Sequence, residues 1–375
     1  MKTCELLIIG AGPAGLSAAI EAAQAGVKVL MIDVNEKAGG QLFKQIHKFF
    51  GSSMHRAGVR GIDIGRELLE RCEELGVEIW LNSLAIGIYS DKRVAVDQKT
   101  GIDEHKLVLV QAQKILISTG ASENAVRFPG WTLPGVMGAG AAQTMTNFHR
   151  VLPGKKVLTI GSGNVGLIVS YQLMQAGAEI EGIVEALPKI NGYAVHASKL
   201  TREGIPIYTG YSIVEAHGTE RVNEAVIAKV NPDWTFEAGT EKTIEVDTIA
   251  IATGLKPLTG LAHMAGCKLI NDRFLGGWAP VHDRNMETTV KDIYIAGDST
   301  GVEEANTAIE EGKLAGIAAA QSLGYISDAE AEELKAAGWE RLGGLREGAH
   351  GAERTQAKEK QIRICNETVQ GGGVA

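Results

Sequence analysis

Apolar positions along the chain follow two patterns, which predict alternating strands and helices. Short uninterrupted apolar runs, such as residues 6–9 and 115–117, are typical of strands buried on both faces. Residues 61–76 instead carry apolar side chains at helical spacing with charges between them, which predicts an amphipathic helix. Because strand-like and helical segments alternate, the pattern predicts an α/β fold built on parallel sheets.

The first apolar run ends in a glycine-rich turn. Gly10, Gly12 and Gly15 follow at G-x-G-x-x-G spacing, with Pro13 and Ala14 between them, and small residues then continue as a predicted helix. A dinucleotide-binding fingerprint requires this strand–turn–helix context. The first glycine permits the tight turn, the second lets the backbone approach a pyrophosphate, and the third lets helix and strand pack closely. The N–H groups at the helix start would face the phosphates.

An acidic residue ends the second predicted strand. The run 28–32 leads to Asp33, about 20 residues after the fingerprint, where an acceptor for a ribose hydroxyl is expected. Gly39, Gly40 and Gln41 follow after a short spacer. This arrangement resembles the extended fingerprint of flavoproteins with two dinucleotide-binding domains, in which the glycine pair approaches the FAD phosphates. The alternative is an ordinary Gly-Gly turn.

Two later strand ends carry related signals. The strand at 114–117 leads to Thr119 and Gly120, an ending that resembles a flavoprotein feature and predicts a strand beside the first one. The run 292–296 ends in Gly297 and Asp298, before a predicted helix. We predict that Asp298 accepts hydroxyl groups of the FAD ribityl chain while the helix dipole faces the flavin. The alternative is a buried aspartate that caps its own helix.

A second copy of the pattern follows in the middle of the chain. Another short apolar strand leads to Gly161, Gly163, Asn164 and Gly166 at the same spacing, then to a helix and to a strand ending in Glu185. The repeat predicts a second Rossmann-type domain. One interpretation is a site for NAD(H) or another adenine nucleotide, because Glu185 suits a ribose 2′-hydroxyl and would repel a 2′-phosphate. The other is a domain whose pocket is empty or used for packing.

The predicted fold is therefore two three-layer Rossmann-type domains, the second inserted into the first. An FAD-binding domain begins in residues 1–122, is interrupted by the second domain in 123–257, and is completed in 258–326. Residues 327–375 are rich in Ala, Glu, Arg and Gly, and predict a short charged helix with a frayed tail. That tail is either solvated or docks a partner.

One basic and aromatic stretch stands out in an otherwise acidic, aromatic-poor chain. Residues 41–60 directly follow the glycine pair, so we expect them to lie near the flavin or at a subunit interface. The alternative is a solvated loop anchored by Phe49 and Phe50. Its candidate polar contacts are Gln41, Lys44, His47 and His55. Position alone makes Lys44 and His47 the candidates for a catalytic role.

Composition narrows the function classes. The formal net charge of −8 argues against general affinity for nucleic acid or acidic membranes. The four cysteines form no C-x-x-C pair, so we expect neither a redox disulfide of the thioredoxin reductase type nor an iron–sulfur or zinc cluster. Scattered thiols, the lack of a strongly basic leader and the lack of an apolar run of about 18 residues predict a cytoplasmic protein.

The order of these motifs resembles the FAD-dependent pyridine nucleotide-disulfide oxidoreductase superfamily. Residues 39–42 with 47–51, and residues 129–136, narrow the match to the FAD subunit of hetero-oligomeric amine and amino-acid dehydrogenases. That group includes hydrogen cyanide synthase, opine oxidases, dye-linked L-proline dehydrogenases and the sarcosine oxidase alpha subunit. The resemblance implies that a partner flavoprotein oxidises the C–N bond of a secondary amine or amino acid. Electrons then pass to this subunit's FAD and leave through iron–sulfur centres or another acceptor.

The chain departs from the larger members of that group in one respect. They carry a C-terminal cysteine-rich cluster domain, whereas the only late cysteine here is Cys365. The resemblance then implies that any cluster lies on a separate small iron–sulfur protein. Two alternatives stay open: a stand-alone NADH-dependent FAD oxidoreductase without a redox disulfide, and a scaffold subunit that binds FAD or an adenine nucleotide without turnover.

Overall fold

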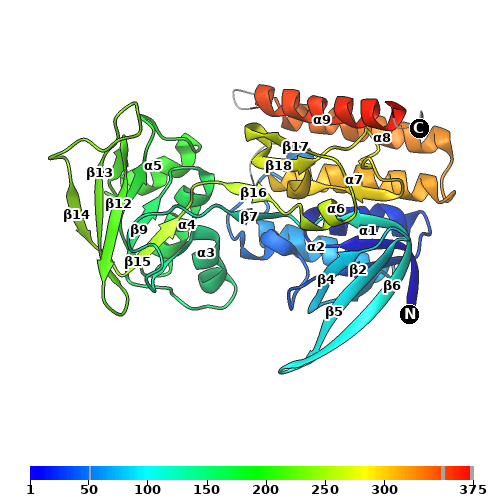
Figure 1. Ribbon diagram of the computed structural model, residues 1–375, viewed down its shortest axis with the longest axis horizontal. Helices are drawn as coiled ribbons and strands as arrows, with labels where there is room; N and C mark the ends of the chain where they lie inside the picture. Colours follow the sequence, from blue (N-terminus) through cyan, green and yellow to red (C-terminus); the bar gives the residue numbers. More distant parts are fainter. Residues whose placement is uncertain (50–51, 348–350, 372–375) are drawn as a thin grey trace. The chain divides into compact units, whose positions relative to one another are not determined.

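The computed structural model describes residues 1–49, 52–347 and 351–371, so that Phe50 and Gly51 of the predicted loop and the terminal residues 372–375 lie outside it. The chain forms two compact units, Met1–Ser122 with the residues from Lys256 onward, and Glu123–Leu255. Figure 1 shows the second unit in green. The chain passes between the units at β7 (Ala121–Glu123) and β16 (Leu255–Pro257), two short strands that pair with each other.

The first unit is built on a sheet whose parallel strands all end at one edge. Its parallel strands are β1 (Lys2–Ile9), β2 (Val29–Ile32), β3 (Glu78–Trp80), β19 (Ile293–Ile295) and the end of β6 (Glu104–Ile117). Ile9 is in register with both Ile32 and Ile117, and Ile117 with Ile295. The segments that follow these strands therefore meet at the carboxyl edge, where open α/β sheets bind ligands. The predicted pairing of the strand at 114–117 with the first strand is confirmed.

Antiparallel strands extend this sheet, and the remaining elements of the unit cover it or lie beside it. β4 (Ser83–Ile88) and β5 (Arg93–Gly101) form a meander with β6. The helices are α1 (Pro13–Gln24), α2 (Gly61–Glu74), α6 (Gly260–Met264) and α7 (Ala305–Ser322), with short 3₁₀ turns η1 (Gly40–Lys44), η2 (Ser53–His55), η3 (Arg273–Leu275) and η4 (Gly297–Thr300). The unit also contains a hairpin of β17 (Leu269–Asp272) and β18 (Gly277–Pro280). Leu6 and Ile8 pack into one apolar layer and Leu7 and Ile9 into the other, as expected for a strand buried on both faces.

The second unit repeats this plan on a smaller scale. Its parallel sheet has the order β11 (Ile207–Thr209), β10 (Glu179–Glu185), β9 (Lys156–Ile160), β15 (Thr248–Ile251) and β8 (Val136–Gly138). Its helices are α3 (Ala139–Asn147), α4 (Asn164–Gln175) and α5 (Ala194–Arg202), and its meander is β12 (Tyr211–Gly218), β13 (Val222–Lys229) and β14 (Lys242–Glu245). Ile160 is in register with both Val184 and Ile251, so this sheet also has a common carboxyl edge.

The residues beyond 326 differ from the short charged helix that the sequence predicts, while the end of the predicted frayed tail, residues 372–375, lies outside the described residues. They form two long helices, α8 (Asp328–Leu345) and α9 (Gly351–Gly371) (Figure 1). Both bury side chains against the first unit, among them Ala331 and Leu342 on α8 and Gln361 on α9. The buried stripe of α9 includes a lysine and a glutamine, so its pattern alone resembles that of a solvated helix. Within the described residues, every helix is too short or too polar to span a lipid bilayer.

Candidate dinucleotide-binding sites

The first fingerprint has the backbone geometry of a phosphate-binding turn. Gly10 has φ +110°, and a Cβ there would lie 2.3 Å from the carbonyl oxygen of Ser118. A Cβ on Gly15 would lie 1.9 Å from the carbonyl oxygen of Gly10. Gly12 is the N-cap of α1, Pro13 occupies its first turn, and neither a capping side chain nor an acid competes for the helix start. The free N–H groups and the helix dipole therefore favour an anion at this point.

The Asp33 carboxylate is fixed against this turn. Its Oδ2 accepts a hydrogen bond from the Ala11 N–H at 2.7 Å, and its Oδ1 accepts bonds from the N–H and side-chain amide of Asn35, both at 2.8 Å. The side chain is buried, yet a carboxylate has about four acceptor positions, so acceptor capacity remains for a ribose hydroxyl. Asn35 was not anticipated. The signal for it was the D-x-N spacing, which is typical of a turn closed by a carboxylate.

The glycine pair closes over the fingerprint. The Gly39 N–H donates to the Ala11 carbonyl oxygen at 2.7 Å, and both glycines have positive φ, +121° and +54°. A Cβ on Gly40 would lie 2.8 Å from the Gly12 Cα. Two stretches of backbone without Cβ atoms thus face each other beside a helix start. The helix start beside this contact fits the diphosphate of a dinucleotide, and a side chain at Gly40 would displace the Gly12 backbone that faces it.

The third signature lies at the same sheet edge. A Cβ on Gly297 would lie 2.9 Å from the Ala14 Cβ, so this glycine packs directly on the start of α1. The Gly120 N–H donates to the Ser299 hydroxyl at 3.3 Å, and the Thr119 hydroxyl donates to the Leu258 carbonyl oxygen at 3.2 Å. The structure therefore brings together the predicted residues of the first site from four separate stretches of chain: Gly10, Gly12, Pro13, Ala14, Gly15, Asp33, Gly39, Gly40, Gln41, Thr119, Gly120, Gly297 and Asp298.

Asp298 has an unusual electrostatic environment. Burial raises the pKa of its carboxyl to about 6, opposed by the N–H of Glu303, which donates to Oδ1 at 3.2 Å. The nearby Glu311 adds to the rise, and Lys358 opposes it. A carboxyl held largely away from water gains by bonding to polar ligand groups, and ribityl hydroxyls are such groups.

The candidate catalytic residues lie on the segment that leaves the glycine pair. Gln41 and Lys44 are on η1, exposed and half-buried respectively. His47 is half-buried in the following loop, with its ring centroid 6.2 Å from that of Phe49. His55 ends η2, where its Nδ1 lies 3.0 Å from the Ser52 hydroxyl. A catalytic role for Lys44 and His47 stays a prediction.

The second unit carries the same turn at the carboxyl edge of its own sheet. Gly161 has φ +107°, and a Cβ on Gly166 would lie 2.2 Å from the carbonyl oxygen of Gly161. Gly163 is the N-cap of α4, and Asn164 begins that helix. The Glu185 carboxylate accepts bonds from the Ser162 N–H at 3.0 Å and its hydroxyl at 2.5 Å. In the first unit the Asp33 carboxylate accepts a hydrogen bond from the Ala11 N–H in the equivalent way. The acidic residue at the end of the second strand is therefore part of the structural repeat.

A loop also closes over the second fingerprint, which the sequence analysis did not anticipate. The Gly192 N–H donates to the Ser162 carbonyl oxygen at 2.8 Å, as Gly39 does to Ala11 in the first unit. The Asn191 N–H donates to the Ser162 hydroxyl at 3.0 Å, and the Tyr193 N–H to the Asn164 side chain at 2.9 Å. The signal was the Asn-Gly pair between a strand and a helix, which marks a turn.

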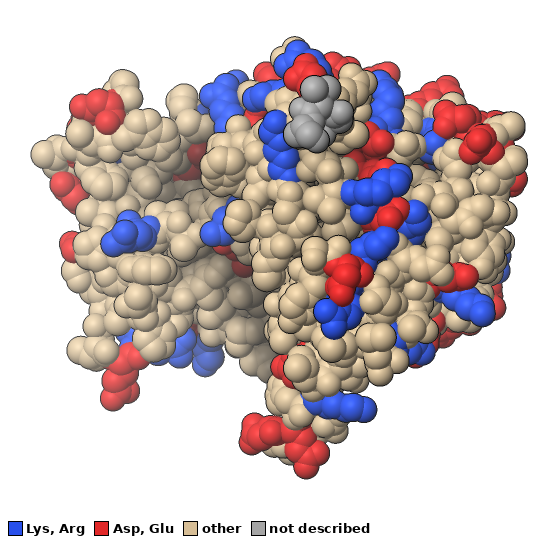
Figure 2. Space-filling model, turned by 45° about the vertical axis from the view of Figure 1, so that its right-hand side comes forward, with Lys and Arg blue, Asp and Glu red and all other residues tan. Residues whose placement is uncertain are grey.

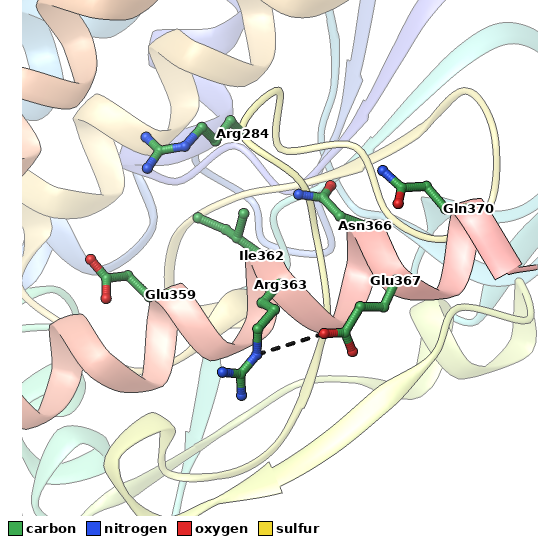
Figure 3. A pocket seen from close by; sticks show the side chains of 7 residues that line it. All are labelled: Arg284, Glu359, Ile362, Arg363, Asn366, Glu367 and Gln370. Carbon is green, nitrogen blue, oxygen red and sulfur yellow. Dashed lines mark ion pairs between the residues drawn. The ribbon is translucent and has the colours of Figure 1, made fainter.

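Neither the charges on the face shown in Figure 2 nor the pocket in Figure 3 indicates a further ligand of the described residues. Basic and acidic side chains alternate over the face shown in Figure 2, without a broad patch of one sign. A shallow pocket of about 310 Å³ lies along α9, lined by Arg284, Glu359, Ile362, Arg363, Asn366, Glu367 and Gln370 (Figure 3). None of these is a predicted site residue. Because its lining mixes both signs of charge, with Arg363 paired to Glu367 at 3.9 Å, it favours neither cations nor anions.

Comparison with known proteins agrees with this geometry. The family model described as pyridine nucleotide-disulphide oxidoreductase matches residues 4–312. The HcnB subunit of hydrogen cyanide synthase from Pseudomonas aeruginosa is 27% identical, and the alignment covers 96% of this chain and 80% of that protein. An opine oxidase subunit from Agrobacterium tumefaciens is 28% identical, with 86% of this chain and 66% of that protein covered.

A solved thioredoxin reductase from T. acidophilum has the same fold, with a TM-score of 0.69 and 22% identity over 86% of this chain and 99% of its own. The predicted fold class is therefore confirmed. The family model spans both fingerprints and the Gly297–Asp298 signature. On this evidence the chain belongs to the pyridine nucleotide-disulphide oxidoreductase family and is an FAD-dependent oxidoreductase.

Proposed function

We propose that this chain is the FAD-binding subunit of a hetero-oligomeric amine or amino-acid dehydrogenase. In this role it relays electrons from a partner flavoprotein to a small iron–sulfur protein or another acceptor. The observation that carries the proposal is a complete dinucleotide cradle without a neighbouring dithiol: Cys4, Cys72, Cys267 and Cys365 are all free thiols in the described residues. Relatives whose names mark them as enzyme subunits support it.

The cofactor role of each residue follows from its position. The phosphates of FAD would lie at the start of α1, beside the close contact between Gly12 and Gly40. Asp33 would accept a ribose hydroxyl and Asp298 a ribityl hydroxyl. FAD supplies the hydride- and electron-accepting chemistry when bound. The chain's own contribution is to bind and orient the cofactor at the sheet edge.

The second fingerprint favours a second candidate function, a stand-alone NADH-dependent FAD oxidoreductase. Its turn, its acid and its closing loop are all in place, and they would suit NAD(H) or another adenine nucleotide without a 2′-phosphate. The two functions differ in the source of electrons. In the first, the electrons come from a partner flavoprotein, and in the second they come from NADH bound by this chain.

The test is an anaerobic titration of the purified chain, followed by flavin absorbance. We expect NADH to leave the flavin oxidised while dithionite reduces it. Addition of an amino-acid substrate together with the co-expressed partner flavoprotein should then reduce the flavin. Stoichiometric bleaching by NADH alone, abolished in a Gly161→Val variant of the second fingerprint, would instead support the stand-alone oxidoreductase. A purified chain without flavin would contradict both.

A further inference from the structure

Two cations from the C-terminal helices lie buried beside the Gly297–Asp298 signature. Arg346 follows the last turn of α8, and Lys358 lies on α9, with side chains only 7% and 3% exposed. Both are directed at two carboxylates, Glu303 and Glu311, which are equally buried. Buried charges are costly unless they are paired and hydrogen-bonded, so this group of two cations and two anions is built as a unit.

The contacts within the group are specific. The guanidinium of Arg346 donates to both oxygens of Glu303, at 3.0 and 2.9 Å, and to Glu311 Oε1 at 2.7 Å. Lys358 Nζ donates to Glu311 Oε1 at 2.9 Å and lies 3.6 Å from Glu303 Oε1. The two cations outweigh the effect of burial and keep the pKa of Glu311 well below its usual range. Glu311 therefore stays ionised and accepts hydrogen bonds at both oxygens.

The same group holds the backbone that carries Asp298. Glu311 Oε2 accepts from the Gly297 N–H at 2.9 Å and from the Thr300 hydroxyl at 3.0 Å, and Lys358 donates to that hydroxyl. The Glu303 N–H donates to Asp298 Oδ1 at 3.2 Å. Asp298 is thus flanked on both sides by residues that the cations fix.

The residue spacing in α9 places Lys358 on the buried face of the helix. Lys358, Gln361 and Cys365 recur at spacings of three and four, so they share the face that packs on the first unit. Gln361 adds a bond from its side-chain amide to the Thr300 carbonyl oxygen at 2.8 Å. Figure 3 shows Arg363 and Glu367 of the same helix beside each other, and both side chains are exposed, as expected for charged groups on a solvated helix face.

We propose that Arg346 and Lys358 are positioning residues for FAD. They fix Glu303 and Glu311, and through these carboxylates they hold Asp298 in place for the ribityl chain. The inference rests on the proposed FAD site and extends that site to α8 and α9, which carry none of the recognised dinucleotide motifs.

The test compares two lysines of α9 in the full-length chain. Lys358→Met removes the buried cation, whereas the control Lys360→Met removes a half-exposed lysine of the same helix, which pairs with Asp272 of β17 at 2.9 Å. Each protein is stripped of flavin and titrated with FAD by fluorescence. We expect Lys358→Met to raise the FAD dissociation constant by about tenfold or more, and Lys360→Met to leave it within about twofold.

A double variant separates positioning from a general loss of packing. Glu311→Gln with Lys358→Met removes one anion together with one cation, and the glutamine keeps an acceptor for the Gly297 N–H. We expect this variant to recover most of the FAD affinity that Lys358→Met loses, and to fold even if the single variant does not. The inference would be overturned, and the proposed function left standing, by either of two results. One is wild-type affinity for FAD in a folded Lys358→Met chain, and the other is a double variant that binds FAD as weakly as the single variant. A wild-type chain that binds no FAD would overturn the proposed function with it.

Discussion

The glycines of the two fingerprints are of two physical kinds. A Cβ at Gly15 or Gly166 would overlap a backbone carbonyl oxygen, at 1.9 and 2.2 Å, so the fold itself requires glycine there. Gly12 and Gly163 differ, because a Cβ at Gly12 would meet its nearest atom only at 3.9 Å and one at Gly163 would meet nothing within 4 Å. Neither has a positive φ. Packing therefore does not explain their lack of a side chain, and we propose that a ligand approaching the backbone does.

This difference predicts opposite outcomes for two alanine variants. Gly12→Ala should change the free energy of unfolding by less than about 1 kcal/mol, because ordinary helix-start backbone accepts alanine, yet it should weaken FAD binding by at least about tenfold. Gly15→Ala should destabilise the chain by about 1–3 kcal/mol or more, because backbone must move. Urea unfolding of the flavin-free proteins and FAD titration distinguish the two. Equal losses of stability would contradict the distinction.

A second residue-scale prediction concerns pH. His282 is fully buried beside the Glu303–Glu311 group, and burial, aided by Lys358, lowers its pKa from 6.5 to about 4. Between these values the unfolded chain binds a proton that the folded chain does not, so stability should fall as pH drops from 6.5 to 4, by about 1.4 kcal/mol per unit.

The measurement is calorimetric unfolding of wild type and His282→Asn at pH 7 and pH 5. Asparagine keeps a donor for the Asp283 carbonyl oxygen, which His282 Nδ1 contacts at 2.8 Å. The variant should lose less stability on acidification, whereas His217→Asn, at an exposed position, should behave as wild type. Parallel pH profiles in all three proteins would show that His282 does not titrate as described.

At the scale of elements, α1 and α7 of the first unit pack with their backbones in close contact. Gly312 and Gly316 of α7 lie one helical turn apart, and Cβ atoms on them would lie 2.1 and 2.4 Å from the carbonyl oxygens of Ala14 and Ala18. The two backbones therefore approach directly, because the facing stripe of α7 consists of glycines. Since α1 begins at the fingerprint and α7 follows Asp298, this contact sets the spacing between the two halves of the candidate flavin site.

Matched glycine substitutions in two helices test this contact. Gly312→Ala should destabilise the chain by several kcal/mol, because alanine would have to displace backbone. Gly343→Ala on α8 meets no atom within 4 Å and should stabilise by up to about 1 kcal/mol through helix propensity. Thermal unfolding of the two variants compares them directly. A stable Gly312→Ala chain would mean that the helices can separate at little cost.

At the scale of the whole molecule, one unit is continuous in sequence and the other is not. Glu123–Leu255 forms the second unit from a single stretch, with apolar clusters of its own. The two ends that it leaves in the first unit lie in contact: the Leu258 N–H donates to the Gly120 carbonyl oxygen at 2.9 Å. The insertion therefore enters and leaves through neighbouring strands, as expected where domain insertion is tolerated.

Removal of the inserted unit tests this organisation. A chain in which a short Gly-Ser linker joins Ser122 to Lys256 should fold and bind FAD within about threefold of the wild-type affinity, because every predicted FAD contact lies in the first unit. Flavin absorbance after gel filtration is the measurement, with Gly15→Ala in the same deletion as the negative control. A deletion chain without flavin or cooperative unfolding would show that the first unit depends on the second.

The sequence allowed prediction of those features that depend on residues close together in the chain. A glycine at Gly10 or Gly39 is required by a turn a few residues long, and the strand ends at Asp33 and Asp298 follow from apolar runs. The buried group of charges could not be predicted from the sequence, because Arg346 and Lys358 lie 35 and 47 positions from Glu311. Such residues have the pattern of a solvated helix until the fold shows which face is covered.

The discontinuity of the first unit has a consequence for synthesis. A ribosome releases residues in order, and domains generally fold as units once their residues are available. The second unit is complete at Leu255, whereas the first still lacks β19, α7 and the two C-terminal helices at that point. At that point of synthesis the second unit can already be folded. The first unit is still incomplete, and its strand β6 is not yet paired with β19. If Lys358 completes the flavin site, tight binding of the cofactor is expected only after α9 has been synthesised, and a bound flavin then identifies a chain made at least through α9.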